Sequence, residues 1–311
     1  MSFSDMLNRY FSKEEMKGWT SIRKSGYILL PLLIYFLVHD LVEVLLWAGV
    51  NQLMVKGNPK VVDLLTDNAY TVQGIVNGLM ILTGVAAIGK VVKGEISKAE
   101  TGSTQAECDT QAKAGCEQVS VSRKQDRNTW INERVVTDYA VIAVLAFSAA
   151  FGLNLLFGLL GITESSEGYA RAANAQYGVA FFVGLFLYGI VSPFAEEAVF
   201  RGVMYNRMKR CFGCLPAIIL SALLFGCYHG NMVQAIYGTL LGVLIAYIYE
   251  KQESFAAPVL FHAVANVSIY AMTYHNSLAH IRTGVSVVMI AVFIGVTAGS
   301  LIYIKHKDVR N

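Results

Sequence analysis

The sequence predicts an all-α polytopic membrane protein, a bundle of about eight transmembrane helices with both termini in the cytoplasm. Of its 311 residues, 55% are hydrophobic and only 15% are charged, and the mean hydropathy is +0.48. A soluble domain carries roughly 25% charged residues. The charges are also concentrated, since residues 1–26 and 90–134 hold 23 of the 47. This composition excludes a soluble globule and a disordered chain.

Long apolar segments give the number of spans. A helix needs about 20 residues to cross roughly 30 Å of hydrocarbon. The fifth and sixth candidates are short, and only Gly230 and Asn231 separate them. The eight candidate spans are about 27–52, 70–90, 135–161, 177–207, 215–230, 232–249, 255–274 and 284–304.

The positions of Lys and Arg give the orientation, because cytoplasmic connections are enriched in both. Five lie in residues 1–26, eight in 90–134, three in 207–210 and three in the tail. The connections between them are poorer in basic residues. Rich and poor connections alternate along the chain, so both termini are expected in the cytoplasm, with the protein in a bacterial plasma membrane.

The chain divides into five segments on this basis. We expect a cytoplasmic amphipathic segment at 1–26, the first two spans within 27–93 and a polar cytoplasmic loop at 94–134. That loop is interpreted as a solvated linker, with a substrate-gathering or regulatory element as the alternative. Six spans follow within 135–304, and 305–311 form a cytoplasmic tail. Gly238 and Gly242 form a Gly-x-x-x-Gly pair that favours close helix packing.

Ionisable residues inside spans indicate where function lies, because each costs at least about 2.5–3.5 kcal/mol at bilayer depth. They gather in the second half of the chain, and structural polar contacts between helices are the alternative interpretation. The set consists of Glu196, Glu197 and Arg201 in the fourth span, His229 in the fifth, and His262 with Asn266 in the seventh.

Helical spacing separates these residues by role. Glu197 and Arg201 are four residues apart, so they can form an ion pair on one helix face. Glu196 points about 100° away and remains available for chemistry. Counted at about 1.5 Å per residue from the cytoplasmic ends, Glu196, His229 and His262 reach a common zone of the bilayer. Pro193, one turn before the carboxylates, can bend the fourth span.

The residue types favour hydrolysis. A Glu and a His that converge can activate water, and a His-Asn pair can stabilise the oxyanion formed when water attacks an amide. Alternatively, Glu196, His229 and His262 could hold Zn²⁺, since two His and one Glu form a known catalytic zinc set. We find no Ser-His-Asp or Cys-His setting, no His-Glu-x-x-His helix and no Gly-rich phosphate loop.

At these residues the sequence resembles the CAAX-protease and bacteriocin-processing (CPBP, or Abi) family of intramembrane proteases, which includes the Ras-converting CAAX endopeptidase. The resemblance covers about residues 177–274. Three family motifs occur in order, each in an apolar segment: Glu-Glu-x-x-x-Arg at 196–201, Phe-x-x-x-His at 225–229 and His-x-x-x-Asn at 262–266.

The resemblance implies roles for the motif residues. Glu196 and His229 would activate the water, and His262 and Asn266 would form the oxyanion site. Glu197 and Arg201 would be a structural and orienting pair, with Phe225 in support. Since the CAAX-type members are similar to metal-independent, glutamate-dependent enzymes, we expect no cofactor, with Zn²⁺ as the alternative.

The resemblance leaves substrate and biological role open. The expected function is cleavage of a membrane-associated peptide or protein near the cytoplasmic half of the bilayer, as in bacteriocin or quorum-signal maturation or in self-immunity. The alternative is a non-catalytic scaffold or immunity protein of the same fold. Expected partners are the substrate, the bilayer and a peptide exporter or sensor kinase, but no nucleic acid. A transporter is disfavoured because no motif is repeated.

Two further groups of residues have weaker claims. His39, Asp40 and Glu43 lie within the first span, either as an addition to the active-site cavity or as a self-paired set facing the bundle. Cys211 and Cys214 form a Cys-x-x-Cys pair, and Cys108 and Cys116 lie in the 94–134 segment. Their spacing does not suit structural zinc, and a reducing cytoplasm disfavours disulfides.

Overall fold

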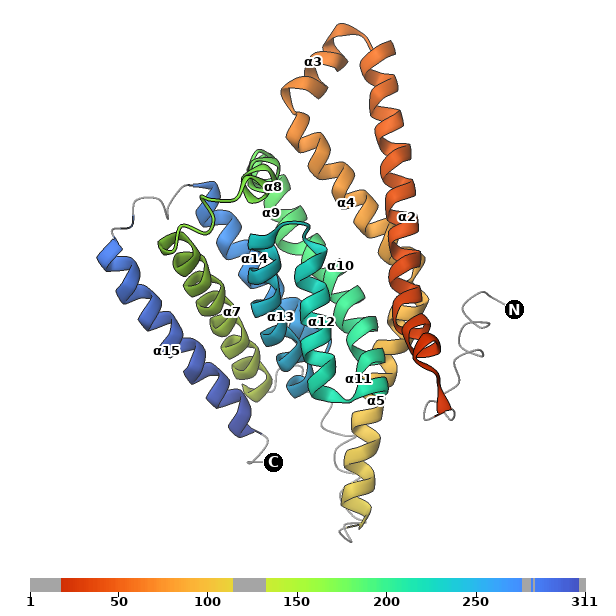
Figure 1. The fold of residues 1–311 in the computed structure, drawn as a ribbon, viewed down its shortest axis with the longest axis vertical. Coiled ribbons are helices and arrows are strands. Elements are labelled where there is room, and N and C mark those ends of the chain that lie inside the picture. The colour runs from red at the N-terminus through yellow and green to blue at the C-terminus, as the bar shows by residue number, and fades with distance from the viewer. Residues whose placement is uncertain (1–17, 114–132, 276–280, 282, 308–311) are drawn as a thin grey trace.

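A computed structural model describes residues 18–113, 133–275, 281 and 283–307, and the described part is helical without strands (Figure 1). Its elements are α2 (Ser21–Lys56), α3 (Pro59–Asp67), α4 (Ala69–Ala87), α5 (Gly89–Lys113), α7 (Glu133–Leu159), α8 (Glu167–Tyr177), α9 (Phe181–Phe186), η3 (Leu187–Val191), α10 (Ser192–Val199), η4 (Phe200–Tyr205), α11 (Asn206–Phe212), α12 (Cys214–Tyr228), α13 (Met232–Gln252), α14 (Ala256–Tyr274) and α15 (Thr283–Lys307).

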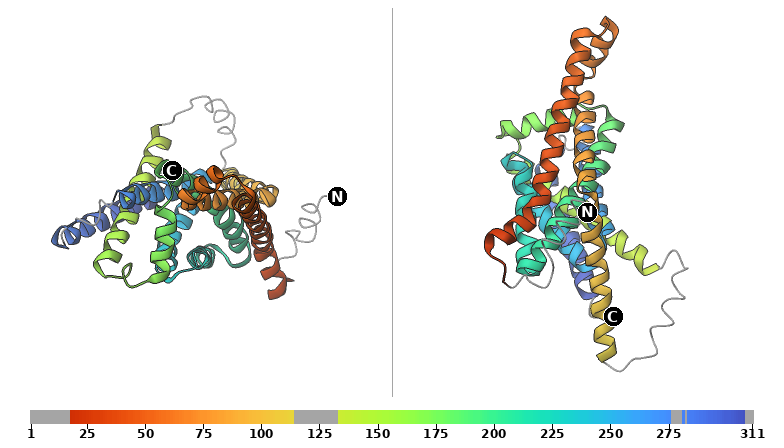
Figure 2. Two further views of the ribbon diagram at one scale, coloured as in Figure 1. Left: turned by 90° about the horizontal axis from the view of Figure 1, so that it is seen from above. Right: turned by 90° about the vertical axis from the view of Figure 1, so that its right-hand side faces the viewer.

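The helices run up and down in one bundle. Helices α7 and α15 form one side, α2 and α4 form the other, and α9 to α14 lie between them (Figures 1 and 2). The start of α2, the far end of α5 and the end of α15 lie at one end of the bundle, whereas α3 and α8 lie at the opposite end (Figure 1). This arrangement brings the connections rich in Lys and Arg to the same end.

An all-α polytopic membrane bundle is confirmed, with a refinement of the number of spans. Among the described residues, seven helices are long and apolar enough to cross a membrane. The remaining apolar helix, α12, has 15 residues, or about 22 Å. Gly213 and Gly230, both at positive φ, lie at its two ends. Since such a backbone conformation strongly favours glycine, these residues fix where α12 starts and stops.

The expectation of a loop from residue 94 onward is wrong for its first part. Helix α5 continues to Lys113, because this polar stretch contains many Ala, Glu, Lys and Gln residues, which favour helix. Its beginning is anchored by Glu95, which is 3% exposed. The Nε atom of Arg207 donates to Glu95 at 3.0 Å, and Arg210 pairs with the same carboxylate. Residues 114–132, 1–17 and 308–311, with the expectations for them, lie outside the described residues.

The helix that carries the two motif carboxylates is irregular on both sides of them. Between Phe181 and Phe212 the chain stays helical, but η3 and η4 are π-helical turns that flank α10. Pro193 has no amide hydrogen to continue the regular pattern, and the Ser192 amide donates to the Leu187 carbonyl five residues back. The bend expected at Pro193 thus takes the form of π turns, which often occur at functional sites.

Helices α12 and α13 approach each other closely through glycines. A Cβ atom on Gly226 would lie 2.2 Å from Thr239 Oγ1 and 2.3 Å from the backbone oxygen of Ala235. A Cβ atom on Gly242 would lie 3.2 Å from the Cα of Ala222. The absence of side chains therefore lets α13 bring the backbone of Gly242 up to the motif residues.

Substitution of Gly226 tests this close approach. We expect Gly226→Ala to destabilise the folded protein by about 1–3 kcal/mol, because its methyl group would overlap backbone that cannot rotate away. Thermal unfolding of the purified protein in detergent measures the effect. Gly49→Ala is the matched control, since Gly49 also lies within a helix but a Cβ atom there meets nothing within 4 Å. Equal stability of the two variants would contradict the close packing.

Candidate active site

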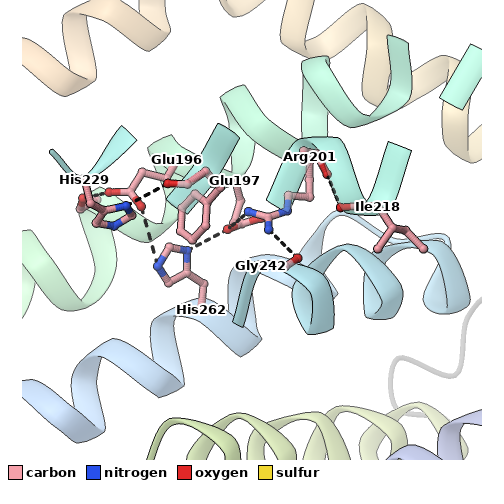
Figure 3. Close-up of polar contacts among 10 residues, drawn as sticks. Glu196, Glu197, Arg201, Ile218, His229, Gly242 and His262 are labelled. Atoms are coloured by element: carbon pink, nitrogen blue, oxygen red, sulfur yellow. Dashed lines mark hydrogen bonds and ion pairs between the residues drawn. The ribbon is translucent and has the colours of Figure 1, made fainter. Parts of the chain in front are cut away.

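A buried arginine holds the two carboxylate-bearing turns in place. Arg201 and Glu197 both have 0% exposure. Arg201 Nη1 donates to Glu197 Oε1 at 2.9 Å, and Nη2 donates to the Gly242 carbonyl at 2.8 Å (Figure 3). The guanidinium carbon also lies 4.7 Å from the centre of the Phe225 ring. Arg201 thereby links η4 to α10, α12 and α13.

Glu197 in turn orients His262. Glu197 Oε1 accepts from Nδ1 of His262 at 2.8 Å. Because an ionised carboxylate only accepts hydrogen bonds, Nδ1 carries a proton. The other nitrogen, Nε2, then points towards Glu196, whose Oε2 lies 3.8 Å away (Figure 3). This separation is longer than a hydrogen bond, and a water molecule can contact both atoms.

Glu196 has a different environment from its neighbour. Its Oε1 accepts from the Ser192 hydroxyl at 2.5 Å. Its Oε2 is buried and has no hydrogen-bond partner among the described residues, as is also true of Glu197 Oε2, but of the two residues only Glu196 lines a cavity. A buried carboxylate oxygen without a partner is costly, so a water or substrate group is the natural partner on this side.

The other two candidates also present polar atoms nearby. His229 caps the end of α12, and its Nδ1 donates to the Phe225 carbonyl at 2.9 Å, which leaves Nε2 as an acceptor in the neutral ring. Asn266 donates one amide hydrogen to the Tyr188 carbonyl at 3.0 Å. One nitrogen of each side chain is thus held by a backbone carbonyl. The remaining polar atom of each side chain can contact a bound molecule.

One cavity of about 220 Å³ joins these groups. Glu196, His229, His262 and Asn266 all line it, and Ser192 and Phe225 do so too. Glu197 and Arg201 do not line it. Apart from Phe225, the motif residues therefore divide into four that can touch a bound molecule and two that support them. Phe225 belongs to both groups, because its ring packs edge-on against His229 and His262 at 5.0 and 5.4 Å between centroids.

Of the two alternatives for His39, Asp40 and Glu43, the structure does not support an addition to the active-site cavity, because none of the three lines it. His39 Nδ1 contacts Asp40 Oδ1 at 2.8 Å. Aromatic rings separate this group from the site: His39 packs on Phe36, and Phe36 packs on Tyr228. These rings fill the space between α2 and α12.

The donor geometry does not fit zinc at Glu196, His229 and His262. Zinc ligand atoms lie about 2.0–2.2 Å from the ion, so they must gather around one point. Among the described residues, the only group of three or more His, Cys, Asp or Glu ligand atoms within 4.8 Å of one another is His39, Asp40 and Glu43.

Several residues that complete the site were missed in the sequence. Ser192 lies four residues before Glu196 on the same helix face, so its spacing could have identified it. The Gly242 carbonyl, the Tyr188 carbonyl and the contact between His262 and Glu197 join helices that are far apart in the chain. No local pattern could have revealed these three partners.

Removal of one member of the buried ion pair tests its structural role. We expect Arg201→Met to lower the free energy of unfolding by about 3–5 kcal/mol, because it leaves the Glu197 charge buried without its partner. The measurement is denaturant unfolding in detergent. Arg171→Met is the control, since Arg171 and Glu167 form an exposed pair with the same spacing. A small effect at both positions would show that the buried pair does not support the fold.

Comparison with known proteins supports the resemblance at the motifs. Residues 178–268 match the family described as type II CAAX prenyl endopeptidase Rce1-like. The chain is also similar to the protein named "Putative membrane peptidase YdiL" of Bacillus subtilis (strain 168), with 21% identity over 129 residues. This alignment covers 42% of the chain and 52% of the relative, so the chain spans about half the length of the curated relative it matches. No solved structure matches significantly.

The family match spans the helices that build the cavity wall at Glu196, His229 and His262, and it contains all three motifs. The curated relative is itself named as a membrane peptidase, in agreement with the apolar helices described above. Over residues 178–268, this multi-pass membrane protein is similar to the type II CAAX prenyl endopeptidase Rce1-like family.

Proposed function

We propose that the protein is an intramembrane endopeptidase that hydrolyses a peptide bond of a membrane-associated peptide or protein. The observation that carries this proposal is the buried Glu196 Oε2, which lacks a hydrogen-bond partner among the described residues beside a cavity that His229 and Asn266 also line. A carboxylate held in this way can take a proton from water.

The hydrolytic water lies between Glu196 and His229 in this mechanism. One of these groups accepts the water proton while the water oxygen bonds to the carbonyl carbon of the substrate. Asn266 donates to the developing oxyanion through its amide. The C–N bond then breaks, and the leaving nitrogen receives the proton that the base had taken.

His262 joins the oxyanion site through Nε2, because Glu197 holds Nδ1 at 2.8 Å and Nε2 faces Glu196 at 3.8 Å beside the cavity. A proton on Nε2 would let it donate to the oxyanion. Glu197 and Arg201 act indirectly, as positioning residues for His262.

The biological role proposed is maturation of a bacteriocin or quorum-signal peptide, or self-immunity, in a bacterial plasma membrane. The support is the resemblance at the motifs and the similarity to a Bacillus subtilis protein. A peptide exporter or a sensor kinase is the proposed partner, since either would share such a peptide with the protease.

Substitution of the cavity residues tests the proposed chemistry. We expect Glu196→Gln, His229→Ala and His262→Ala each to reduce peptide processing by about 10²–10⁴-fold, which is typical for loss of an acid-base or oxyanion group. Processing of a candidate peptide by cells or vesicles is measured by mass spectrometry. Asp40→Asn is the control, because Asp40 lies outside the cavity. Processing that survives in all three variants would refute proteolysis.

A chelator tests the proposed independence from metal. Since the Glu and His atoms are not gathered around one point, we expect the rate of processing to be unchanged after dialysis against 1,10-phenanthroline. Loss of activity that returns with added Zn²⁺ would contradict the metal-free mechanism without contradicting proteolysis.

A further inference from the structure

The cavity does not end at the catalytic residues, and its far part lies outside the family-matched segment. From Glu196 it continues to α7 and α8, where Asn154, Tyr169 and Gln176 line it. On the basis of the proposed function, we propose that this extension is the subsite for the substrate residue beside the scissile bond. It takes one uncharged aromatic or aliphatic side chain and is reached from the α8 end of the bundle.

The wall of the extension has no charged side chain. Away from Glu196 and the two histidines, the cavity is lined only by uncharged groups, several of them tyrosines. Tyr169 and Tyr177 come from α8, outside the candidate spans. Burial raises the pKa of Tyr169, and it raises the pKa of Tyr177 to about 12, so both hydroxyls keep their protons at neutral pH. A substrate Lys or Asp would be buried here without a counter-charge, which is costly.

The size of the cavity suits one residue. About 220 Å³ is below the roughly 300–1,000 Å³ of pockets for drug-sized ligands. It equals the liquid volume of about seven waters at roughly 30 Å³ each. One large side chain with its peptide group can therefore occupy the space beside Glu196, whereas a folded helix cannot.

The direction from which a substrate reaches the cavity follows from the side chains that lie towards each end of the bundle from Glu196. Towards the end where α2 starts, the chain continues into η4, where Val203, Met204 and Tyr205 are at most 1% exposed. None of these three side chains lines the cavity. Towards the opposite end lie Tyr169 and Gln176 of α8, which are only partly buried. Helix α8 lies at the end opposite to the far end of α5 and to the end of α15 (Figure 1), so this access is from the non-cytoplasmic side and departs from the expected cleavage near the cytoplasmic half of the bilayer.

Thiol labelling tests the access route without any substrate. One variant carries a single cysteine at Asn154→Cys, with all five native cysteines replaced by Ser, and a second retains only Cys214. Vesicles of both orientations receive a membrane-impermeant methanethiosulfonate reagent. We expect the two cysteines to react from opposite sides. Ala173→Trp should slow the labelling of Asn154→Cys at least tenfold, because Ala173 lines the cavity.

Ala170→Trp is the matched control for this experiment, since Ala170 is an exposed position on the same helix that does not line the cavity. We expect it to leave the labelling rate unchanged. Labelling of Asn154→Cys from the side of Cys214, or a rate that Ala173→Trp does not alter, would overturn access from the α8 end.

A specificity measurement tests the subsite itself. Wild-type protein in vesicles receives a library of single-span synthetic peptides that vary at one residue, and products are identified by mass spectrometry. We expect cleavage beside Phe, Tyr, Leu or Met to exceed cleavage beside Lys or Asp at least tenfold in kcat/KM. Gln176→Glu keeps the side-chain shape but adds a carboxylate, so we expect it to raise cleavage beside Lys at least tenfold.

The outcomes separate the two proposals. An unchanged profile in Gln176→Glu, or no preference in the wild type, overturns the subsite and leaves proteolysis standing. If Glu196→Gln cleaves the library as well as the wild-type protein does, or if the wild-type protein cleaves no peptide in it, the result counts against the proposed function instead.

Discussion

The site depends on one constraint: charges buried at bilayer depth must compensate one another. Hydrocarbon supplies no water to solvate Arg201, Glu197 or Glu196. Arg201 meets this requirement with one carboxylate and one backbone carbonyl, at 2.9 and 2.8 Å. Since the Gly242 carbonyl belongs to another helix, the same contacts that neutralise the charge also fix the position of α13 against η4.

The chemistry follows from the one carboxylate of the pair that makes no hydrogen bond to Arg201. Glu197 is shared between Arg201 and His262, which both donate to its Oε1, and it does not line the cavity. Glu196, one residue earlier, turns to the other side of the helix and keeps one oxygen without a hydrogen-bond partner beside the cavity. A pair of adjacent glutamates therefore provides one structural anion and one candidate base. The flanking π turns and Pro193 occur where this arrangement departs from a regular helix.

Much of this site could be predicted from spacing alone, because helical periodicity acts locally. The spacing of four residues between Glu197 and Arg201 corresponds to the observed ion pair, and Glu196 points elsewhere as expected. The contact of His262 with Glu197 spans 65 residues in the chain, so it depends on tertiary packing. The same holds for the cavity extension, since no periodicity indicates that α8 packs against α13 and α14.

The errors in the sequence analysis have physical causes. The 94–134 segment was expected to be a loop because it is polar, yet polar residues with high helix propensity continue α5 to Lys113. The first-span group of His39, Asp40 and Glu43 lies at about the same depth in the bilayer as the motif residues. Depth along a helix, however, does not determine which neighbouring helix a given face packs against. Aromatic packing of Phe36 on Tyr228 keeps that group apart from the cavity.

The central claim is that Glu196 and His229 activate water and that Glu196 does not itself attack the substrate. A single turnover of the wild-type protein in ¹⁸O-labelled water, with excess enzyme over a cleaved peptide, tests it most directly by mass spectrometry. The account predicts one ¹⁸O atom in the new carboxyl terminus of the product and none in the peptide that contains Glu196. Appearance of ¹⁸O in the Glu196 side chain, with an unlabelled product, would contradict it.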